Sequence, residues 1–152
     1  MRHTFTREQF IDRPLDDVFA FFADANNLQR ITPGWLHFRM LTPGPIEMRV
    51  GARIDYRIRL RGVPIVWKTG IRDWDPPRRF VDVQVQGPYR VWEHTHEFAA
   101  VSNGTLVRDV VEYELPAGRL GEIMRTMFVA RDIAAIFDHR RVVLAEIFGS
   151  DS

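Results

Sequence analysis

Cysteine is absent from the 152 residues of the sequence, and serine and lysine are scarce. Without cysteine the protein has no disulfide, no thiolate nucleophile and no thiolate metal ligand. The only serines are Ser102, beside an expected turn, and Ser150 and Ser152 near the C-terminus, which argues against a serine triad. Lys68 is the only lysine, so any Schiff-base chemistry would depend on it.

The sequence also lacks long apolar runs and any large charge excess. No apolar segment approaches the ~20 residues of a membrane span, and residues 1–5 do not resemble the start of a secretory signal. The 21 basic and 20 acidic residues give a net charge of +1, which provides no general attraction for nucleic acid or an anionic membrane. We therefore expect a cytoplasmic protein without membrane insertion or a nucleic-acid partner, while monomer and homodimer both remain open.

Hydrophobic and aromatic residues, by contrast, are plentiful. Hydrophobic residues make up 45% of the sequence, which contains 11 Phe, 4 Trp and 3 Tyr. That fraction excludes a disordered chain, and a chain of this length can bury one sizeable core. Since no linker, repeat or low-complexity segment divides the sequence, we expect a single domain over residues 1–152.

The N-terminal part of the sequence predicts one strand and two short helices. The strand is expected at His3–Asp12, after which Pro14 suits the first position of a helix. Four apolar residues at helical spacing follow, namely Leu15, Val18, Phe19 and Phe22. A further helical turn is expected at Leu28–Thr32, where Pro33-Gly34 ends it.

The middle of the sequence changes to a two-residue period, which predicts β-strands. Turn residues, mostly Gly, Pro, Asn and Asp, separate the expected strands. These strands span Leu36–Leu41, Ala52–Arg61, Ile65–Trp74, Phe80–Gln86, Arg90–Ala100 and Thr105–Leu115. Because the loops are short, successive strands are expected to pair antiparallel as a meander.

The segment Arg119–Phe148 predicts one long helix. It has no proline and its only glycine is Gly121, so an uninterrupted helix of about 42 Å is expected. Two neighbouring apolar stripes run along it, the inner one including Met127, and such a wide arc suits a helix held against a curved sheet. Arg140-Arg141 interrupts both stripes, and we favour a surface ion pair there over a cap on a cavity mouth or a contact with an acidic ligand group.

Three local features accompany this order of elements: Asp12–Phe22 with Asn27-Leu28 after it, Gly51 at the start of the third strand, and the terminal helix. Together they resemble the START-like superfamily, also called SRPBCC, which joins lipid-transfer START domains, polyketide cyclases and birch-pollen-allergen-type proteins. The resemblance implies an α+β helix-grip fold, in which a seven-stranded curved antiparallel sheet wraps around a long C-terminal helix, with two short helices after strand 1.

The resemblance also implies a function for this fold. A single START-like ligand-binding domain would keep a deep pocket between sheet and helix for sterols, lipids, polyketides or hormones, and some members use it for catalysis. Further segments, Trp74–Pro77 and Gly87–Tyr89 with Trp92–His96, resemble a bacterial branch known only for ligand binding. These motifs specify the fold and say little about chemistry.

Turn positions predict which strand residues face that pocket. A two-residue loop at Gly62-Val63 would place Tyr56 opposite Thr69 and Ile58 opposite Trp67, with all four on the inner face. Aromatic residues on this face are expected as pocket walls, with ordinary core packing as the alternative.

The strand Phe80–Gln86 is ambiguous, because a shift of one residue turns every side chain to the other face. A two-residue loop at Gly87-Pro88 points Val81, Val83 and Val85 inward. A three-residue loop, Gly87–Tyr89, points Asp82, Gln84 and Gln86 inward instead. We favour inward valines because the outer face is then polar throughout.

His94 and His96 form the most specific chemical pattern. Alternate residues of a strand share a face, so both imidazoles should enter one space. A two-residue loop at Asn103-Gly104 would bring Tyr113 opposite His94 and Asp109 diagonal to His96. Asp109 could then orient an imidazole or complete a two-His–one-carboxylate site. We favour these groups as anchors for a ligand's polar end over purely structural pairing, metal binding or acid–base catalysis; no metal or cofactor is predicted.

The sequence therefore predicts binding of a small, largely apolar molecule, a lipid, aromatic or polyketide-like compound, between the sheet and the C-terminal helix. The candidate ligand-binding residues are Tyr56, Trp67, Thr69, Trp92, His94, His96, Asp109, Tyr113 and Met127. The alternative is a polyketide cyclase or dehydratase-like enzyme with His94, His96 and Asp109 as acid–base groups. A protein-interaction module with a filled core is a third hypothesis.

Overall fold

A computed structural model describes residues 1–149 of the chain; Ser150 and Ser152 lie outside the described residues. The strands are β1 (His3–Ile11), β2 (Arg39–Met40), β3 (Arg53–Leu60), β4 (Val63–Asp75), β5 (Arg79–Gln86), β6 (Val91–Val101) and β7 (Gly104–Glu114). The helices are α1 (Leu15–Ala23), α2 (Asn27–Arg30), the 3₁₀ turn η1 (Gly34–Leu36), α3 (Gly118–Met124), the π-helix η2 (Arg125–Val129) and α4 (Ala130–Phe148).

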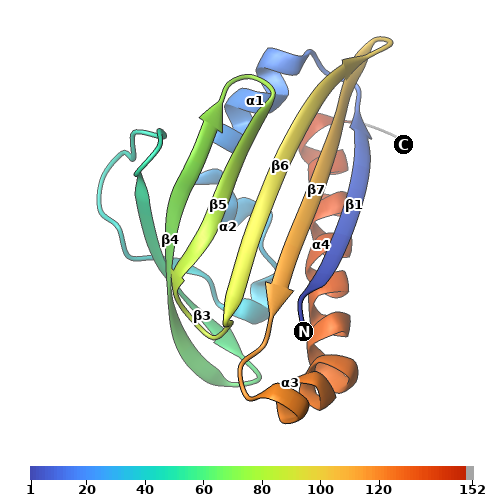
Figure 1. Cartoon of the computed structure of the whole chain (residues 1–152). Coiled ribbons are helices and arrows are strands. Elements are labelled where there is room, and N and C mark those ends of the chain that lie inside the picture. Colours follow the sequence, from blue (N-terminus) through green and yellow to red (C-terminus); the bar gives the residue numbers. More distant parts are fainter. Residues whose placement is uncertain (150–152) are drawn as a thin grey trace.

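The seven strands form one antiparallel sheet in the order β1-β7-β6-β5-β4-β3-β2. The sheet curves, and α1, α2 and α4 lie on the same side of it (Figure 1). Helix α4 runs along β7 and β1, while α3 lies at the end of the sheet where β7 ends (Figure 1). The helix-grip fold predicted from the sequence is confirmed. Within the described chain, no helix is long and apolar enough to cross a membrane.

The first expected strand of the meander is much shorter than predicted. Of the predicted Leu36–Leu41, the strand covers Arg39–Met40, and the Leu41 N–H still donates to the Asp55 carbonyl of β3 at 2.8 Å. The preceding residues form η1, and His37 follows with a φ of 49°. A left-handed residue cannot continue an extended strand, so β2 begins only after it.

Two hairpin turns begin one residue earlier than predicted. The β3–β4 turn is Arg61-Gly62, both with positive φ as a type I′ turn requires, so that Tyr56 pairs with Trp67. The β6–β7 turn is Ser102-Asn103, which places His96 opposite Asp109. Each error moves the partner by two residues. Since the side chains of a strand alternate with a period of two, the inner face is unchanged.

The prediction that the valines of β5 point inward is wrong. Asp82 pairs with His94, the register that the three-residue loop requires, and residues 87–90 connect the two strands. The side chain of Gln84 closes this loop, donating to the Tyr89 carbonyl at 2.7 Å and accepting from its N–H at 3.0 Å. Asp82 consequently faces the interior, whereas Val85 is exposed on the outer face.

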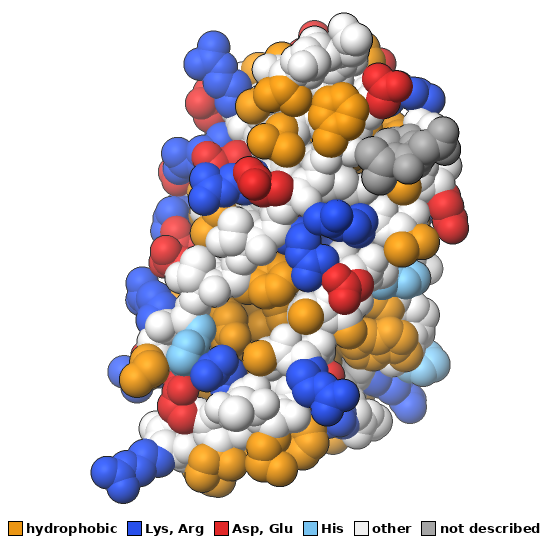
Figure 2. Space-filling view, turned by 90° about the vertical axis from the view of Figure 1, so that its right-hand side faces the viewer, with side chains coloured by type: hydrophobic (Ala, Val, Ile, Leu, Met, Phe, Trp, Pro, Cys, Tyr) orange, Lys and Arg blue, Asp and Glu red, His pale blue; other side chains and the backbone are white. Residues whose placement is uncertain are grey.

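The predicted C-terminal helix is interrupted by the π-helix η2. A π turn takes up an extra residue, so the side chains before it are rotated relative to those of α4. Apolar residues of α3 and η2 consequently point to solvent: Leu120, Ile123 and Met127 are 63%, 54% and 54% exposed. A row of hydrophobic side chains is visible along the lower end of the molecule, where α3 lies (Figure 2).

The largest of four clusters of buried apolar side chains lies at the opposite end of the sheet, under α1, and Phe22, Ile31 and Phe80 of this cluster also border the cavity described below. It joins α1 to the near ends of β5, β6 and β7 and to the last turns of α4. We call this region the packed end; its buried members are Ile11, Val18, Phe19, Phe22, Ile31, Phe80, Phe98, Val107 and Leu144.

Candidate functional site

A cavity of about 320 Å³ lies between the inner face of the sheet and α4. Its volume is at the lower end of the range typical for small-molecule sites. The walls are mostly apolar side chains from α1, the α2 segment, β3, β4, η2 and α4, together with Leu36 and Phe38 before β2, and β5 and β6 also contribute residues. A recess with hydrophobic side chains at its floor is visible on one face of the molecule (Figure 2).

Aromatic rings form much of the sheet side of this cavity. The rings of Tyr56 and Trp67 stack with centroids 6.0 Å apart, and Trp92 meets Trp67 edge-on at 5.2 Å. Tyr56 and Trp67 come from neighbouring strands and point inward by the period-two rule. Burial raises the pKa of the Tyr56 hydroxyl, the charge of Asp82 raises it further, and Tyr56 also interacts with the Thr69 side chain.

One side of the cavity is polar. His94 and His96 project from alternate positions of β6, and their rings stack with centroids 3.7 Å apart. His94 Nε2 lies 2.8 Å from Asp109 Oδ1 on β7, and His96 Nε2 lies 2.5 Å from Asp82 Oδ2 on β5. The two carboxylates thus flank a stacked imidazole pair. We call Asp82, His94, His96, Asp109 and the nearby Arg140 the polar cluster.

Arg140 supplies the positive charge of this cluster. It lies on α4, is 7% exposed, and its Nη2 is 3.7 Å from Asp109 Oδ1. Its guanidinium also lies over the rings of Phe137 and Phe22, at 4.9 and 5.7 Å from the centroids. The favoured surface ion pair is therefore wrong for Arg140. The sequence contained a signal for it, because an arginine that interrupts an apolar stripe must either reach solvent or find a buried partner.

Burial and charge set the protonation of the cluster. Burial would raise the pKa of Asp109, but the Arg140 guanidinium and the hydrogen bond with His94 hold it well below its usual value. Burial likewise opposes ionisation of Asp82, but the hydrogen bond with His96 and the charges of His96, His94 and Arg140 together outweigh it, so that the pKa is lowered. Burial lowers the pKa of His96 to about 4, and the neighbouring His94 contributes in the same direction. Near neutral pH both carboxylates are therefore ionised and His96 is neutral.

Six of the nine candidate residues line the cavity, namely Tyr56, Trp67, Thr69, Trp92, His94 and His96. Asp109 is buried directly behind His94, while Tyr113 is 4% exposed and packs against Trp92 and Tyr89. Met127 is not among the lining residues. The rotation produced by η2 turns it outward and brings its neighbour Phe128 to the cavity instead.

Asp82 is the site residue that the favoured sequence interpretation missed. It faces the cavity, and its side chain keeps 19% of its surface exposed there. The alternative three-residue loop predicted this orientation. The length of that loop depends on the side-chain bonds of Gln84 to the Tyr89 backbone, which the hydrophobic pattern does not encode.

Asp82, His94 and His96 are also close enough to be considered as metal ligands, with one donor atom of each within 4.8 Å of the others. In tetrahedral zinc sites neighbouring ligand atoms lie about 3.3 Å apart, because each is about 2.0–2.1 Å from the ion. Here Asp82 Oδ2 is 2.5 Å from His96 Nε2 and 4.0 Å from His94 Nδ1. The first distance is that of a hydrogen bond, and the two imidazoles are stacked rather than convergent. The arrangement therefore fits a hydrogen-bonded network better than a metal site.

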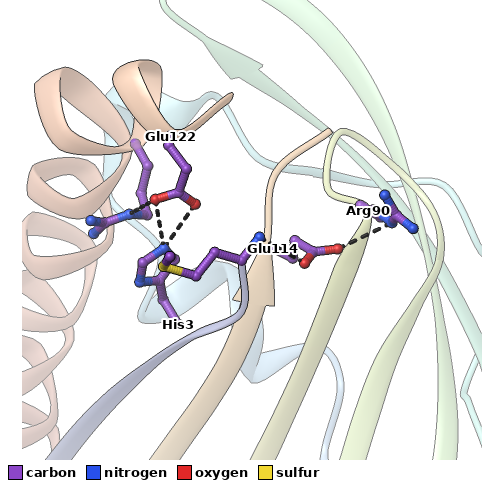
Figure 3. A network of polar contacts seen from close by, with 6 residues as sticks. His3, Arg90, Glu114 and Glu122 are labelled. Carbon is purple, nitrogen blue, oxygen red and sulfur yellow. Dashed lines mark hydrogen bonds and ion pairs between the residues drawn. The ribbon is translucent and has the colours of Figure 1, made fainter. Parts of the chain in front are cut away.

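A second polar network lies outside the cavity and fastens α3 to the sheet (Figure 3). His3 Nε2 on β1 lies 2.9 Å from both carboxylate oxygens of Glu122 on α3. The N-terminal ammonium of Met1 and the guanidinium of Arg90 both pair with Glu114, at 3.0 and 3.1 Å. The contact of His3 with Glu122 fastens α3 to β1, and the contacts of Glu114 join the N-terminus and Arg90 to β7.

Comparisons with known proteins agree with this architecture. Residues 11–138 match the family model described as polyketide cyclase / dehydrase and lipid transport. Among curated proteins, none matches the sequence. The fold is similar to that of the protein TTHA0849 from Thermus thermophilus, with a TM-score of 0.72, 16% identity, and 95% of this chain and 99% of that chain covered.

Two further solved structures show the same fold. Ara h 8.0201 is similar with a TM-score of 0.63 and 13% identity, over 96% of this chain and 99% of that one. Major latex-like protein 151 from Panax ginseng has a TM-score of 0.59 and 17% identity, over 88% of this chain and 96% of that one. At these identities the likeness concerns the fold alone.

Proposed function

The chain belongs to the polyketide cyclase / dehydrase and lipid transport family, and from this premise we propose that it is a single START-like domain that binds a small, largely apolar molecule in the cavity between sheet and α4. The observation that carries the proposal is the cavity itself, a hollow of about 320 Å³ with mostly apolar walls and one polar cluster. Pockets for small molecules commonly combine these two features.

The two kinds of wall have separate roles in this proposal. The aromatic and aliphatic side chains of β3, β4 and α4 bind the body of the ligand, because burying its apolar surface is favourable. The polar cluster binds one end of the ligand and fixes its orientation. Asp82, His94, His96 and Arg140 line the hollow, while Asp109 lies behind them and pairs with His94 and Arg140.

Native mass spectrometry of the protein purified from cells tests this function. We expect a co-purifying molecule that dissociates on unfolding. Ile136→Trp would fill the cavity from α4 and should abolish the bound mass, whereas Val142→Trp, on the exposed side of the same helix, should retain it. Equal ligand content in both variants would place binding outside the cavity.

Acid–base catalysis is the second candidate, favoured by the contact between His94 and Asp109. A carboxylate that accepts from one imidazole nitrogen fixes the tautomer and leaves the other nitrogen free to accept a proton. When supplied with a polyketide-like compound, a dehydratase would release a molecule that has lost water, and a cyclase would release an isomer of the same mass, which chromatography before mass spectrometry separates from the substrate. A binder would return that compound unchanged.

A further inference from the structure

The polar cluster carries an excess of negative charge. It contains two carboxylates, Asp82 and Asp109, and one guanidinium, Arg140. The two imidazoles stack at 3.7 Å, so repulsion opposes charging both of them at once. With both imidazoles neutral, the two carboxylates and the guanidinium give the cluster a net negative charge. Protonation of one imidazole brings the net charge to zero, and a net positive charge would require both imidazoles to be protonated.

The lone guanidinium of the cluster is ion-paired, although its Nε–H has no hydrogen-bond partner among residues 1–149. Arg140 shares its charge with Asp109, whose Oδ1 is 3.7 Å away, and with the two aromatic rings beneath it. An anionic ligand that approached Arg140 would also approach Asp109. Like charges in a buried site cost several-fold more than at the surface, because water does not screen them.

Asp82, in contrast, has a free acceptor atom. Its contacts with His96 and His94 both use Oδ2, and within residues 1–149 no donor reaches Oδ1. Since Asp82 lines the cavity and is partly exposed to it, this oxygen is available to a ligand. A donor on the ligand that reaches this oxygen would form a charge-assisted hydrogen bond, which is stronger than one between neutral groups.

The other charges on the cavity lining do not change this balance. Arg61 and Asp132 face each other at 3.0 Å near the β3–β4 turn, and their charges cancel. Asp24, after α1, adds a further acidic group to the lining. Over the described residues, the interior thus offers acceptors and negative charge to a ligand, and no unpaired cation.

From this arrangement we infer that the ligand carries a hydrogen-bond-donating end, a hydroxyl or an ammonium group, which binds Asp82 Oδ1, and that apolar molecules ending in a carboxylate are disfavoured. The inference rests on the proposed binding function and narrows it. Fatty acids and other apolar carboxylates fall outside the ligand class. Phenols, alcohols and amines with a ring-sized or chain-like apolar body fall inside it.

A series of compounds with one apolar body and different ends tests the inference. The series is naphthalene, 2-naphthol, 2-naphthylmethylamine and 2-naphthoate, and binding is followed by the fluorescence of Trp67 and Trp92, which line the cavity. Near neutral pH we expect the amine and the naphthol to bind more tightly than naphthalene. The amine should bind at least about tenfold more tightly than the naphthoate.

Asp82→Asn removes the negative charge and keeps the size of the side chain. It should bring the affinities of the amine and the naphthoate to within about threefold of each other. The matched control is Asp138→Asn, which removes a carboxylate from the exposed side of α4, where it pairs with Arg7, and should leave the ranking unchanged. The order of affinities measured with the wild-type protein shows by itself whether the cavity prefers the cationic amine or the anionic naphthoate, even if Asp82→Asn folds poorly.

The outcomes separate this inference from the function on which it rests. If none of the four compounds binds, both are overturned. If naphthalene binds and all four affinities are equal, cavity binding stands and the role of Asp82 is overturned. If the naphthoate binds most tightly, Arg140 rather than Asp82 selects the ligand, and the inference is overturned.

Discussion

The two ends of the sheet contain similar aromatic side chains but arrange them differently. At the packed end, Phe19 of α1 contacts the rings of Phe80 and Phe98 with centroids 6.1 and 5.2 Å apart, and α1 fills the concave face. At the other end, Trp67 and Trp92 contact each other but leave one side toward the cavity. Residue type alone therefore does not decide between core and pocket. The difference depends on whether a helix in addition to α4 fills the space beside the rings, as α1 does at the packed end.

The largest expected effect is a loss of stability at the packed end. Phe19→Ala should lower the free energy of unfolding by about 3–5 kcal/mol, because it creates a new void among closely packed rings. Phe38→Ala, the same chemical change beside the existing cavity, should cost less than half as much, since its ring already borders a hollow. Urea denaturation of both variants measures the difference. Equal losses would show that the two ends are packed alike.

A smaller effect is expected from His96, which joins the two ends by stacking on Phe80 at 4.1 Å. Its folded-state pKa is lowered to about 4 from an ordinary value near 6.5, so between these values the unfolded chain binds a proton that the folded chain does not. Stability should therefore fall as pH decreases from about 6.5 to about 4, by up to about 1.4 kcal/mol per pH unit.

The variant His96→Gln should flatten this part of the profile, which thermal unfolding across pH measures. His37→Asn, on an exposed residue, is the control and should leave the slope as it is. The carboxylates contribute in a separate window. The pKa values of Asp82 and Asp109 are lowered on folding, so their stabilisation is complete above the ordinary value near 3.9 and is lost only as pH falls below it. If the slope of stability between about pH 4 and about pH 6.5 is unchanged in His96→Gln, a group other than His96 titrates in that range.

The smallest effect concerns the two neighbouring residues of η2. Met127→Ala should change stability by no more than about 0.5 kcal/mol, because the side chain is 54% exposed. Phe128→Ala removes a ring from the cavity lining and should weaken the binding of 2-naphthol several-fold, whereas Met127→Ala should not. The reverse result would mean that the helix keeps its α-helical phase through this segment.

The fold followed from the sequence because its signals are redundant. Turn residues, the two-residue period and the long C-terminal stripe all indicated the same architecture, and the errors at Gly62-Val63 and Asn103-Gly104 moved partners without changing faces. Both imidazoles were therefore assigned to the interior without knowledge of the register.

The remaining parts of the site depend on features that the pattern does not encode. The inward position of Asp82 depends on one residue of loop length, which two side-chain bonds of Gln84 select. The outward position of Met127 depends on a π-helix, which has no distinct apolar period. The burial of Arg140 depends on a carboxylate brought from β7, so its partner is known only once the sheet is assembled.

The pairing of β1 with β7 has a consequence for how the protein forms. His3 on β1 lies opposite Tyr113 on β7. Strand β1 is synthesised before β7, so it has no backbone partners until β7 has been made. Strands β3 to β7 join neighbours that follow directly in the chain, and such local hairpins close quickly, whereas contacts between distant segments are slow to form. We expect the nascent chain to collapse around the meander first, with the N-terminal strand docking late and completing the edge of the sheet beside α4.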